Sequence, residues 1–207
     1  MAGELNLGLI PTIAPYLLPE IISQLKHKFP QLSLWLHEHQ TSILLEKLKN
    51  AELDLVILAL PVDTDEFSQI ELYQEAFWLA VPDHETLSKK KSIQLVDLNK
   101  HEMLLLEEGH CLRGQALEIC FSAGASENNT FRATSLETLR HMVIEGIGMT
   151  LLPELAVPKK RALSDSIQYI PFTAPQPTRQ IGILYRKNSY REETFKQIAR
   201  VIKEKIN

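Results

Sequence analysis

The chain has 207 residues, of which 44% are hydrophobic and 23% charged, as in an ordinary soluble protein of one or two domains. Its net charge is -4 and its longest basic run is Lys89-Lys90-Lys91, so it lacks the basic surface with which a domain binds nucleic acid by itself. Two cysteines exclude a disulfide-rich secreted scaffold, and neither a signal peptide nor a run of 18 apolar residues is present. We therefore expect a cytoplasmic protein without a membrane partner.

Strand and helix patterns alternate through the first 60 residues. Apolar strands are predicted at Leu5–Ile10, Leu32–His39 and Leu53–Leu60, and the helices between them begin at Thr12 and at Thr41-Ser42. The third strand is almost wholly apolar, which is typical of a strand buried on both faces. This pattern predicts a βαβαβ unit with parallel strands, and ligands bind such units beyond the carboxyl ends of the strands.

A second set of strands and helices follows Glu71. A helix is expected to open at a capping box, Thr134-Ser135-Leu136-Glu137, and to end near Gly146. The chain therefore predicts an α/β fold of two small subdomains that face each other across a cleft. The other expected elements are strands Phe77–Val81, Glu102–Leu106, Thr130–Ala133, Met149–Leu152, Ile167–Ile170 and Gln180–Tyr185, and a last helix Arg191–Ile206.

Hydroxyl side chains stand at the start of three predicted helices: Thr12, Thr41 with Ser42, and Thr134 with Ser135. N-capping explains each of them taken alone. Three in one chain favour a polar cleft, because the free amide groups of helix N-termini bind small polar ligands.

Both cysteines lie in one stretch, Glu107–Phe121, for which the apolar spacing predicts a helix over residues 111–121. Cys120 falls on the apolar face of that helix. Cys111 falls on the polar face in the first turn, where the helix dipole favours a thiolate. The stretch is a candidate redox switch, and two unrelated reduced thiols are the alternative.

The spacing of the two cysteines constrains any bond between them. In an intact helix, nine residues separate the two Cα atoms by ~13.5 Å. A disulfide needs Cα atoms within about 7 Å of each other. If these cysteines form a disulfide, the helix must therefore unwind.

Other candidate sites have weaker support. His37-Glu38-His39 and Glu107–Cys111 contain metal-binding side chains, but neither stretch has the ligand spacing of a zinc site. Gly146-Ile147-Gly148 lacks the third glycine of a dinucleotide fingerprint and follows a helix instead of a strand. There is no C-x-x-C, G-x-S-x-G or P-loop motif. We predict no metal and no cofactor.

Six stretches are recognisable together: Leu9–Thr12, Pro15–Pro19, Glu107–Arg113, Cys120-Phe121, Phe131–Arg140 and Leu151–Pro153. They resemble the regulatory domain of the OxyR family, the peroxide-sensing members of the LysR-type transcriptional regulators. The similarity runs along nearly the whole chain, and His-Cys-Leu-Arg with a second cysteine nine residues after the first is specific to this family. The resemblance implies two Rossmann-like subdomains, similar to type 2 periplasmic binding proteins, with the first at residues 1–74 plus 181–207 and the second at 75–180.

The resemblance also implies roles for individual residues. Cys111 resembles the peroxidatic cysteine and Cys120 the resolving cysteine. The residues that resemble those around the peroxide and the thiolate are Thr12, Thr41, His110 and Arg179. Gly114 departs from the family pattern, in which an acidic residue follows Cys-Leu-Arg, and glycine lowers helix stability by ~1 kcal/mol relative to alanine.

The implied function is that of a sensor, not an enzyme. Hydrogen peroxide would oxidise Cys111 to a sulfenic acid, and a disulfide with Cys120 would refold residues 111–120 and change the geometry of a homodimer or homotetramer. In the family, a winged helix-turn-helix absent from this chain binds DNA, the full-length activator contacts RNA polymerase to switch on oxidative-stress genes, and thiol reductants reverse the switch. A LysR-type domain that binds a small organic effector in the cleft and a thiol peroxidase are the alternatives.

Overall fold

The computed structural model describes residues 3–63, 65–159 and 166–206. The described chain forms two compact units, one from Met1–Gln74 with Gln180–Asn207 and the other from Glu75–Arg179. Gln180 therefore belongs to the first unit, whereas we expected it in the second. The reason is its register, since Gln180 pairs with Leu60 in the sheet of the first unit.

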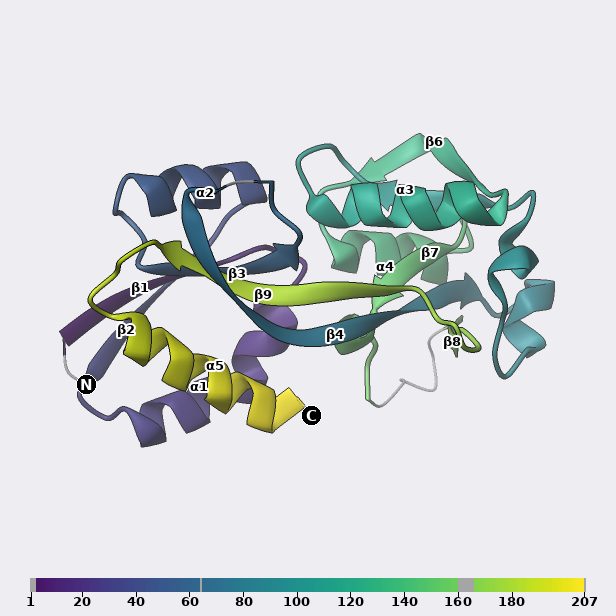
Figure 1. The fold of residues 1–207 in the computed structure, drawn as a ribbon. Helices are drawn as coiled ribbons and strands as arrows, with labels where there is room; N and C mark the ends of the chain where they lie inside the picture. The colour runs from purple at the N-terminus through teal and green to yellow at the C-terminus, as the bar shows by residue number, and fades with distance from the viewer. Residues whose placement is uncertain (1–2, 64, 160–165, 207) are drawn as a thin grey trace. The chain divides into compact units, whose positions relative to one another are not determined.

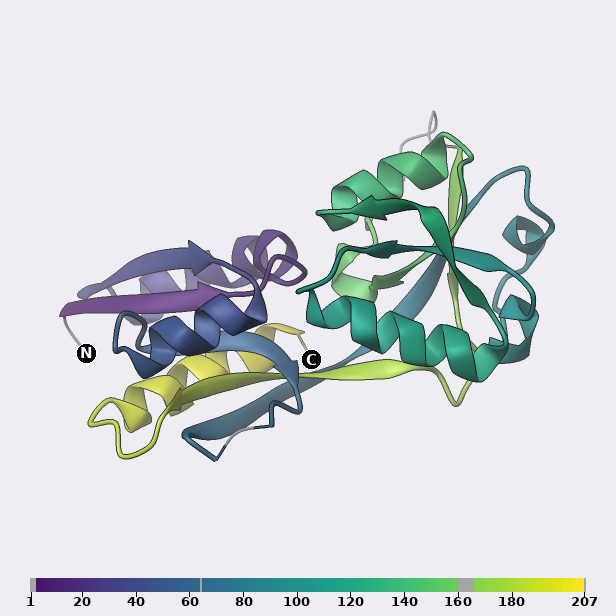
Figure 2. The ribbon, with the colours of Figure 1, turned by 90° about the horizontal axis from the view of Figure 1, so that it is seen from above.

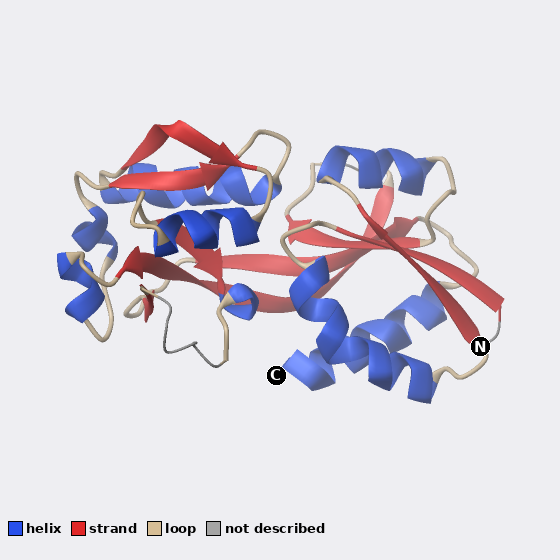
Figure 3. Ribbon diagram, turned by 180° about the vertical axis from the view of Figure 1, so that it is seen from behind, coloured by secondary structure: helices blue, strands red, loops and turns tan. Residues whose placement is uncertain are grey.

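The first unit is a sheet with helices on both faces. Its parallel strands have the order β2-β1-β3, and β9 joins them antiparallel to β3. Helices α1 and α5 lie side by side on one face of this sheet, and α2 covers the other (Figures 1 and 3). The elements are β1 (Gly3–Leu9), α1 (Ala14–Lys28), β2 (Leu32–Glu38), α2 (Thr41–Lys49), β3 (Leu55–Leu60), β9 (Thr178–Arg186) and α5 (Glu192–Ile206).

Apolar packing holds this unit together as the sequence predicts. All six residues of β3 are buried, so the prediction of a strand buried on both faces is confirmed. Phe195, Ile198 and Ile202 form the buried face of α5. Helix α2 packs closely on β1 at Gly8. A Cβ atom at that position would lie only 2.7 Å from Leu44 Cδ2. The βαβαβ arrangement is confirmed.

Helix α2 begins at Thr41, as predicted, whereas the cap predicted at Thr12 is wrong. Helix α1 begins at Ala14 after Ile13 as its N-cap, and α2 begins at Thr41 after Gln40, with no side-chain cap in either case. Neither Thr12 nor Thr41 therefore caps a helix. An N-cap needs a non-helical backbone directly before the first helical residue. Thr12 precedes that position by one residue and Thr41 follows it by one.

The third cap lies one residue later than predicted. Ser135, not Thr134, is the N-cap of α4 (Leu136–Ile144), and its hydroxyl accepts a hydrogen bond of 3.2 Å from the Thr138 amide. Glu137 pairs with Arg140 at 3.2 Å and stands at the second helical position, whereas a capping box uses the third. The reason is that Ser135 holds the extended backbone that a cap requires.

The second unit combines an antiparallel sheet with a small parallel one. Strand β4 pairs with β7 and β8, while β5 and β6 form a separate two-stranded sheet that α3 and α4 contact (Figures 1 and 2). The elements are β4 (Phe67–Pro82), η1 (Thr86–Lys89), η2 (Leu95–Leu98), β5 (Glu102–Leu106), α3 (Cys111–Ala123), β6 (Ser126–Ala133), α4, β7 (Thr150–Pro153), η3 (Glu154–Ala156) and β8 (Ile167–Pro171).

Two strands run from one unit into the other. Strand β4 begins ten residues before the predicted Phe77–Val81, at Phe67, and so crosses from the first unit to the second. Strand β9 returns the chain to the first unit. None of the described helices combines the length and the apolar composition that a membrane span requires.

Candidate functional site

Helix α3 carries both cysteines. Cys111 is its first residue and is partly exposed, whereas Cys120 is buried with 1% of its surface exposed. The predicted helix over residues 111–121 is confirmed and continues to Ala123. Both cysteines are free. Because the helix is unbroken between them, the rise per residue separates their Cα atoms by ~13.5 Å, too far for a disulfide.

The two thiols have different surroundings. Burial raises the pKa of the Cys120 thiol to about 11, so only roughly one molecule in ten thousand carries a Cys120 thiolate at pH 7. Cys111 lies at the helix N-terminus, where unpaired amide groups and the helix dipole favour an anion. The arrangement places a partly exposed thiol at the start of α3 and a buried thiol near its end.

His110 is the N-cap residue of α3 and is 8% exposed. Burial lowers the pKa of its imidazole, although the nearby Glu107 carboxylate partly opposes this shift. The side chain is therefore neutral near pH 7. A neutral imidazole donates a hydrogen bond from one ring nitrogen and accepts one at the other. His110 can thus act as a hydrogen-bond donor and as an acceptor.

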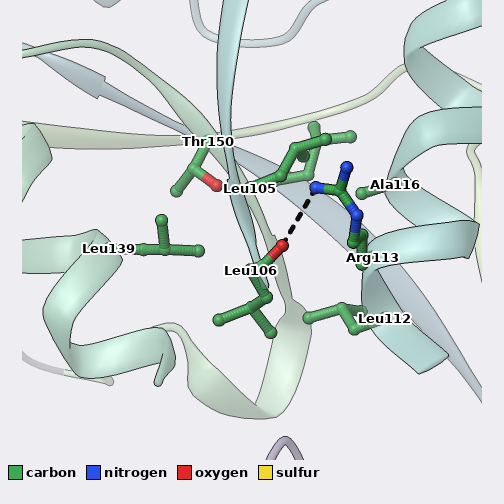
Figure 4. A pocket seen from close by; sticks show the side chains of 8 residues that line it. Leu105, Leu106, Leu112, Arg113, Ala116, Leu139 and Thr150 are labelled. Atoms are coloured by element: carbon green, nitrogen blue, oxygen red, sulfur yellow. Dashed lines mark hydrogen bonds between the residues drawn. The ribbon is translucent and has the colours of Figure 1, made fainter. Parts of the chain in front are cut away.

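Arg113 ties α3 to both strands of the small sheet. Its Nη1 and Nη2 atoms donate to the two carboxylate oxygens of Glu127 in β6 at 2.7 and 2.8 Å. Nη1 also donates to the Leu106 carbonyl, at the end of β5, at 3.0 Å (Figure 4). Hydrogen bonding from Arg113 lowers the pKa of Glu127, and Arg132 pairs with the same carboxylate at 3.1 Å. We call the Arg113–Glu127–Leu106 contact the clamp.

A small cavity lies beneath α3, and the apolar side chains of Leu105, Leu112, Ala116 and Leu139 line much of it (Figure 4). Its volume is about 10 Å³, about the minimum that holds one water molecule. The Thr150 hydroxyl at its wall already donates to the Leu104 carbonyl at 2.7 Å. This cavity is far too small for an organic effector.

Arg179 is in β9 and belongs to the second unit, as do the cysteines. Its Nε and Nη2 atoms contact Oε2 of Glu75 at 2.8 and 2.7 Å, and the two side chains are 1% and 2% exposed. The other Glu75 oxygen accepts a hydrogen bond of 3.0 Å from the Leu155 amide. Glu75 therefore fixes the orientation of Arg179.

Thr12 and Thr41 belong to the first unit. They follow β1 and β2, which are parallel neighbours, so both residues lie at the carboxyl edge of that sheet. Thr12 is 3% exposed. The Thr41 hydroxyl is buried and has no hydrogen-bond partner within the described structure. A buried hydroxyl of this kind normally meets a water molecule or a ligand.

Glu75 and Glu127 are site residues that no sequence pattern predicted. Each is paired with an arginine distant in the sequence, and no local motif marks such a pair. For metals, the described residues contain no group of three His, Cys, Asp or Glu side chains that could hold an ion. His37 Nε2 lies 3.1 Å from the Asn6 side-chain oxygen, and His39 lies beyond the end of β2.

The family model described as LysR substrate binding domain matches residues 1–207. The chain belongs to this LysR family. It is 45% identical to the DNA-binding transcriptional dual regulator OxyR of Escherichia coli (strain K12), with 100% of this chain and 68% of that protein covered. It is 43% identical to the hydrogen peroxide-inducible genes activator of Haemophilus influenzae, again with 100% of this chain and 68% of that protein covered.

Solved structures agree with the family assignment. The oxidized form of OxyR matches this LysR-family chain with a TM-score of 0.90 at 46% identity, and the reduced form with 0.91 at 42% identity. Each match covers 100% of this chain and 97% of the other. These matches confirm the predicted α/β fold of the type 2 periplasmic-binding kind and the resemblance to OxyR regulatory domains.

Proposed function

We propose that this chain is the redox-sensing regulatory domain of an OxyR-type transcriptional regulator, with Cys111 as the peroxide sensor and Cys120 as its disulfide partner. One observation carries the proposal: a single helix holds a partly exposed thiol at its N-terminus and a buried thiol nine residues later. The relatives support it, because they are named hydrogen peroxide-inducible genes activators and OxyR has been solved in oxidized and reduced forms.

The first step is attack of the Cys111 thiolate on one oxygen of hydrogen peroxide. The S–O bond forms as the O–O bond breaks, which gives a sulfenic acid and a leaving hydroxide. The leaving hydroxide becomes water by taking up the proton that Cys111 released to solvent, and neutral His110 can orient the peroxide oxygens by hydrogen bonding. In this proposal the hydroxyls of Thr12 and Thr41 orient the peroxide and Arg179 steadies the thiolate. The unpaired Thr41 hydroxyl supports its part in binding.

The second step is attack of Cys120 on the sulfenic sulfur of Cys111. The S–S bond forms as the S–O bond breaks, and the departing hydroxide takes the proton of Cys120 and leaves as water. Because the intact helix holds the two Cα atoms ~13.5 Å apart, residues 111–120 must leave their helical conformation for this bond to form. A small chemical change at one sulfur thereby becomes a rearrangement of a whole segment.

The rearrangement is the signal in the full-length regulator. A refolded segment 111–120 presents different surface, which would change the geometry of a homodimer or homotetramer. In the complete protein an N-terminal domain would bind DNA, and the new geometry would alter contact with RNA polymerase and activate oxidative-stress genes. Cytoplasmic thiol reductants would return the domain to its starting state. The domain is a stoichiometric sensor and not a turnover enzyme.

Mass spectrometry tests the proposal. After brief treatment with one equivalent of hydrogen peroxide, we expect the wild-type domain to lose two hydrogens as one intramolecular disulfide. Cys120→Ser should instead gain one oxygen at Cys111 that dimedone traps. Unchanged thiol content in the wild type would contradict the proposal. A full-length regulator whose response survives Cys111→Ser would favour the alternative of an organic effector.

A further inference from the structure

We propose that Glu127 is a positioning residue for the switch: by holding Arg113 it keeps α3 closed, and it thereby sets the rate of disulfide formation without altering peroxide attack. This inference rests on the proposed function, because it concerns the second of its two steps. Glu127 would act through Arg113 and not by contact with the reacting sulfur atoms.

The clamp joins the part of the chain that must move to strands outside it. Arg113 lies two residues after Cys111, inside the segment that must unwind. Glu127 lies in β6, seven residues beyond Cys120, and the Leu106 carbonyl lies at the end of β5. Side-chain exposure of 12% for Arg113 and 13% for Glu127 shields these hydrogen bonds from water.

Unwinding of α3 breaks this arrangement. The bidentate contact requires both Arg113 Nη atoms to face the Glu127 carboxylate, while Nη1 also keeps the Leu106 carbonyl. A backbone that leaves the helix at Arg113 changes the position and direction of that side chain. The three hydrogen bonds must therefore be released before Cys111 and Cys120 can meet.

Other features of α3 hold it less firmly. Gly114 is exposed in the helix interior and has no atom within 4 Å of the place where a Cβ would be. The small cavity beside Leu112 and Ala116 leaves the packing of the buried face incomplete. His110 gives no side-chain cap, and Oε1 of Gln115 is buried without a hydrogen-bond partner in the described structure. The clamp thus adds three hydrogen bonds from a charged side chain to a helix whose capping and packing are incomplete.

Rapid-quench mass spectrometry on this chain separates the two steps. Sulfenic acid formation is timed in a Cys120→Ser background, and disulfide formation is timed with Cys120 present. We expect Glu127→Ala to speed the disulfide step by about tenfold and to leave the sulfenic step unchanged, since hydrogen bonds to a charged group are lost only from the closed helix. Arg132→Ala is the matched control, because it removes the more exposed second partner of the same carboxylate and leaves Arg113 in place. The rate of disulfide formation in Arg132→Ala should stay within about twofold of the wild-type rate.

A charge swap tests whether the effect acts through the clamp. The Glu127 carboxylate also raises the pKa of Cys120, though less than burial does, so its removal could act on that thiol directly. Arg113→Glu with Glu127→Arg rebuilds the ion pair, though not the hydrogen bond to the Leu106 carbonyl, while placing a positive charge at position 127. A return toward the slow wild-type rate supports the clamp. A rate as fast as that of Glu127→Ala would overturn it.

Each remaining outcome either supports or overturns the role proposed for Glu127. An unchanged disulfide rate in Glu127→Ala, or an equal change in both steps, overturns the inference and leaves the proposed function standing. No disulfide in the wild type overturns the proposed function and the inference with it. If Glu127→Ala does not fold, the isosteric Glu127→Gln replaces it. Faster amide hydrogen exchange over residues 111–123 of reduced Glu127→Gln supports the clamp, and unchanged exchange opposes it.

Discussion

The second unit contains two arginine–glutamate pairs that differ in burial and in what they join. Arg179 and Glu75 are 1% and 2% exposed, and Glu75 also binds the Leu155 amide. Arg113 and Glu127 are 12% and 13% exposed, and they tie a helix to a small sheet. The same chemistry therefore serves one place that must stay fixed and another that is proposed to move.

Burial explains the difference. Removing one partner of a fully buried pair leaves an uncompensated charge in an apolar region, so such a pair opens only with loss of the local fold. A pair that is 12% and 13% exposed keeps some access to water, so it can separate at a smaller free-energy cost than one that is 1% and 2% exposed. The Arg179–Glu75 pair is thus suited to a contact that stays closed in the folded protein, and the clamp is suited to a contact that opens.

The largest expected effect comes from breaking the buried pair. Glu75→Ala should lower the free energy of unfolding by about 3–5 kcal/mol, because it leaves the Arg179 guanidinium buried without its carboxylate. Chemical denaturation of the reduced domain measures this, with Arg132→Ala as a control at an exposed pair. A loss below about 1 kcal/mol would mean that Arg179 finds another partner or reaches water, and the contrast between the pairs would fail.

A smaller effect is expected from Gly114→Ala. Alanine fits without contact at this exposed position and should stabilise α3 by ~1 kcal/mol. Since disulfide formation requires α3 to open, the second step should slow by up to about fivefold, while peroxide attack on Cys111 stays the same. Thermal unfolding and rapid-quench mass spectrometry check the two parts. A more stable domain with an unchanged disulfide rate would show that opening at Gly114 does not limit the switch.

The smallest expected effect is the pH dependence of the clamp. Arg113 lowers the pKa of Glu127 below its unfolded value of ~4.3, so the stabilisation is fully present above that value and is lost as the pH falls toward the lower folded pKa. The stability difference between wild type and Glu127→Gln should therefore shrink below about pH 4. Denaturant titrations of both proteins at matched pH measure it. A difference that stays constant into acid would contradict an ionised carboxylate in the clamp.

Local patterns in the sequence predict much of the fold. The spacing of Leu112, Ala116 and Cys120 correctly places one cysteine inside and the other at the start of α3, because helix geometry fixes which residues share a face. The apolar run Leu53–Leu60 likewise predicts a buried strand, which the structure has at Leu55–Leu60. Both predictions depend only on neighbours within a few turns or residues, and both are confirmed.

Features that depend on distant residues are harder to predict. Thr12 and Thr41 have the residue type of a cap, but the backbone angles at the helix start decide which residue takes that place. Glu75 meets Arg179 and Glu127 meets Arg113 only because the strands are arranged in three dimensions. A single sequence contains no local signal for either contact, so the positions of both carboxylates follow from the structure alone.

The burial of Cys120 imposes a delay between oxidation of Cys111 and disulfide formation in the proposed sensor. Once Cys111 has reacted, the second thiol stays out of reach until α3 opens, and with a pKa of about 11 it remains protonated while it waits. The delay before locking is then set by the lifetime of a helix and not by the concentration of peroxide. In the proposed sensor, a sulfenic acid that a reductant removes before α3 opens would leave no disulfide, and only one that persists until the helix opens would form the bond.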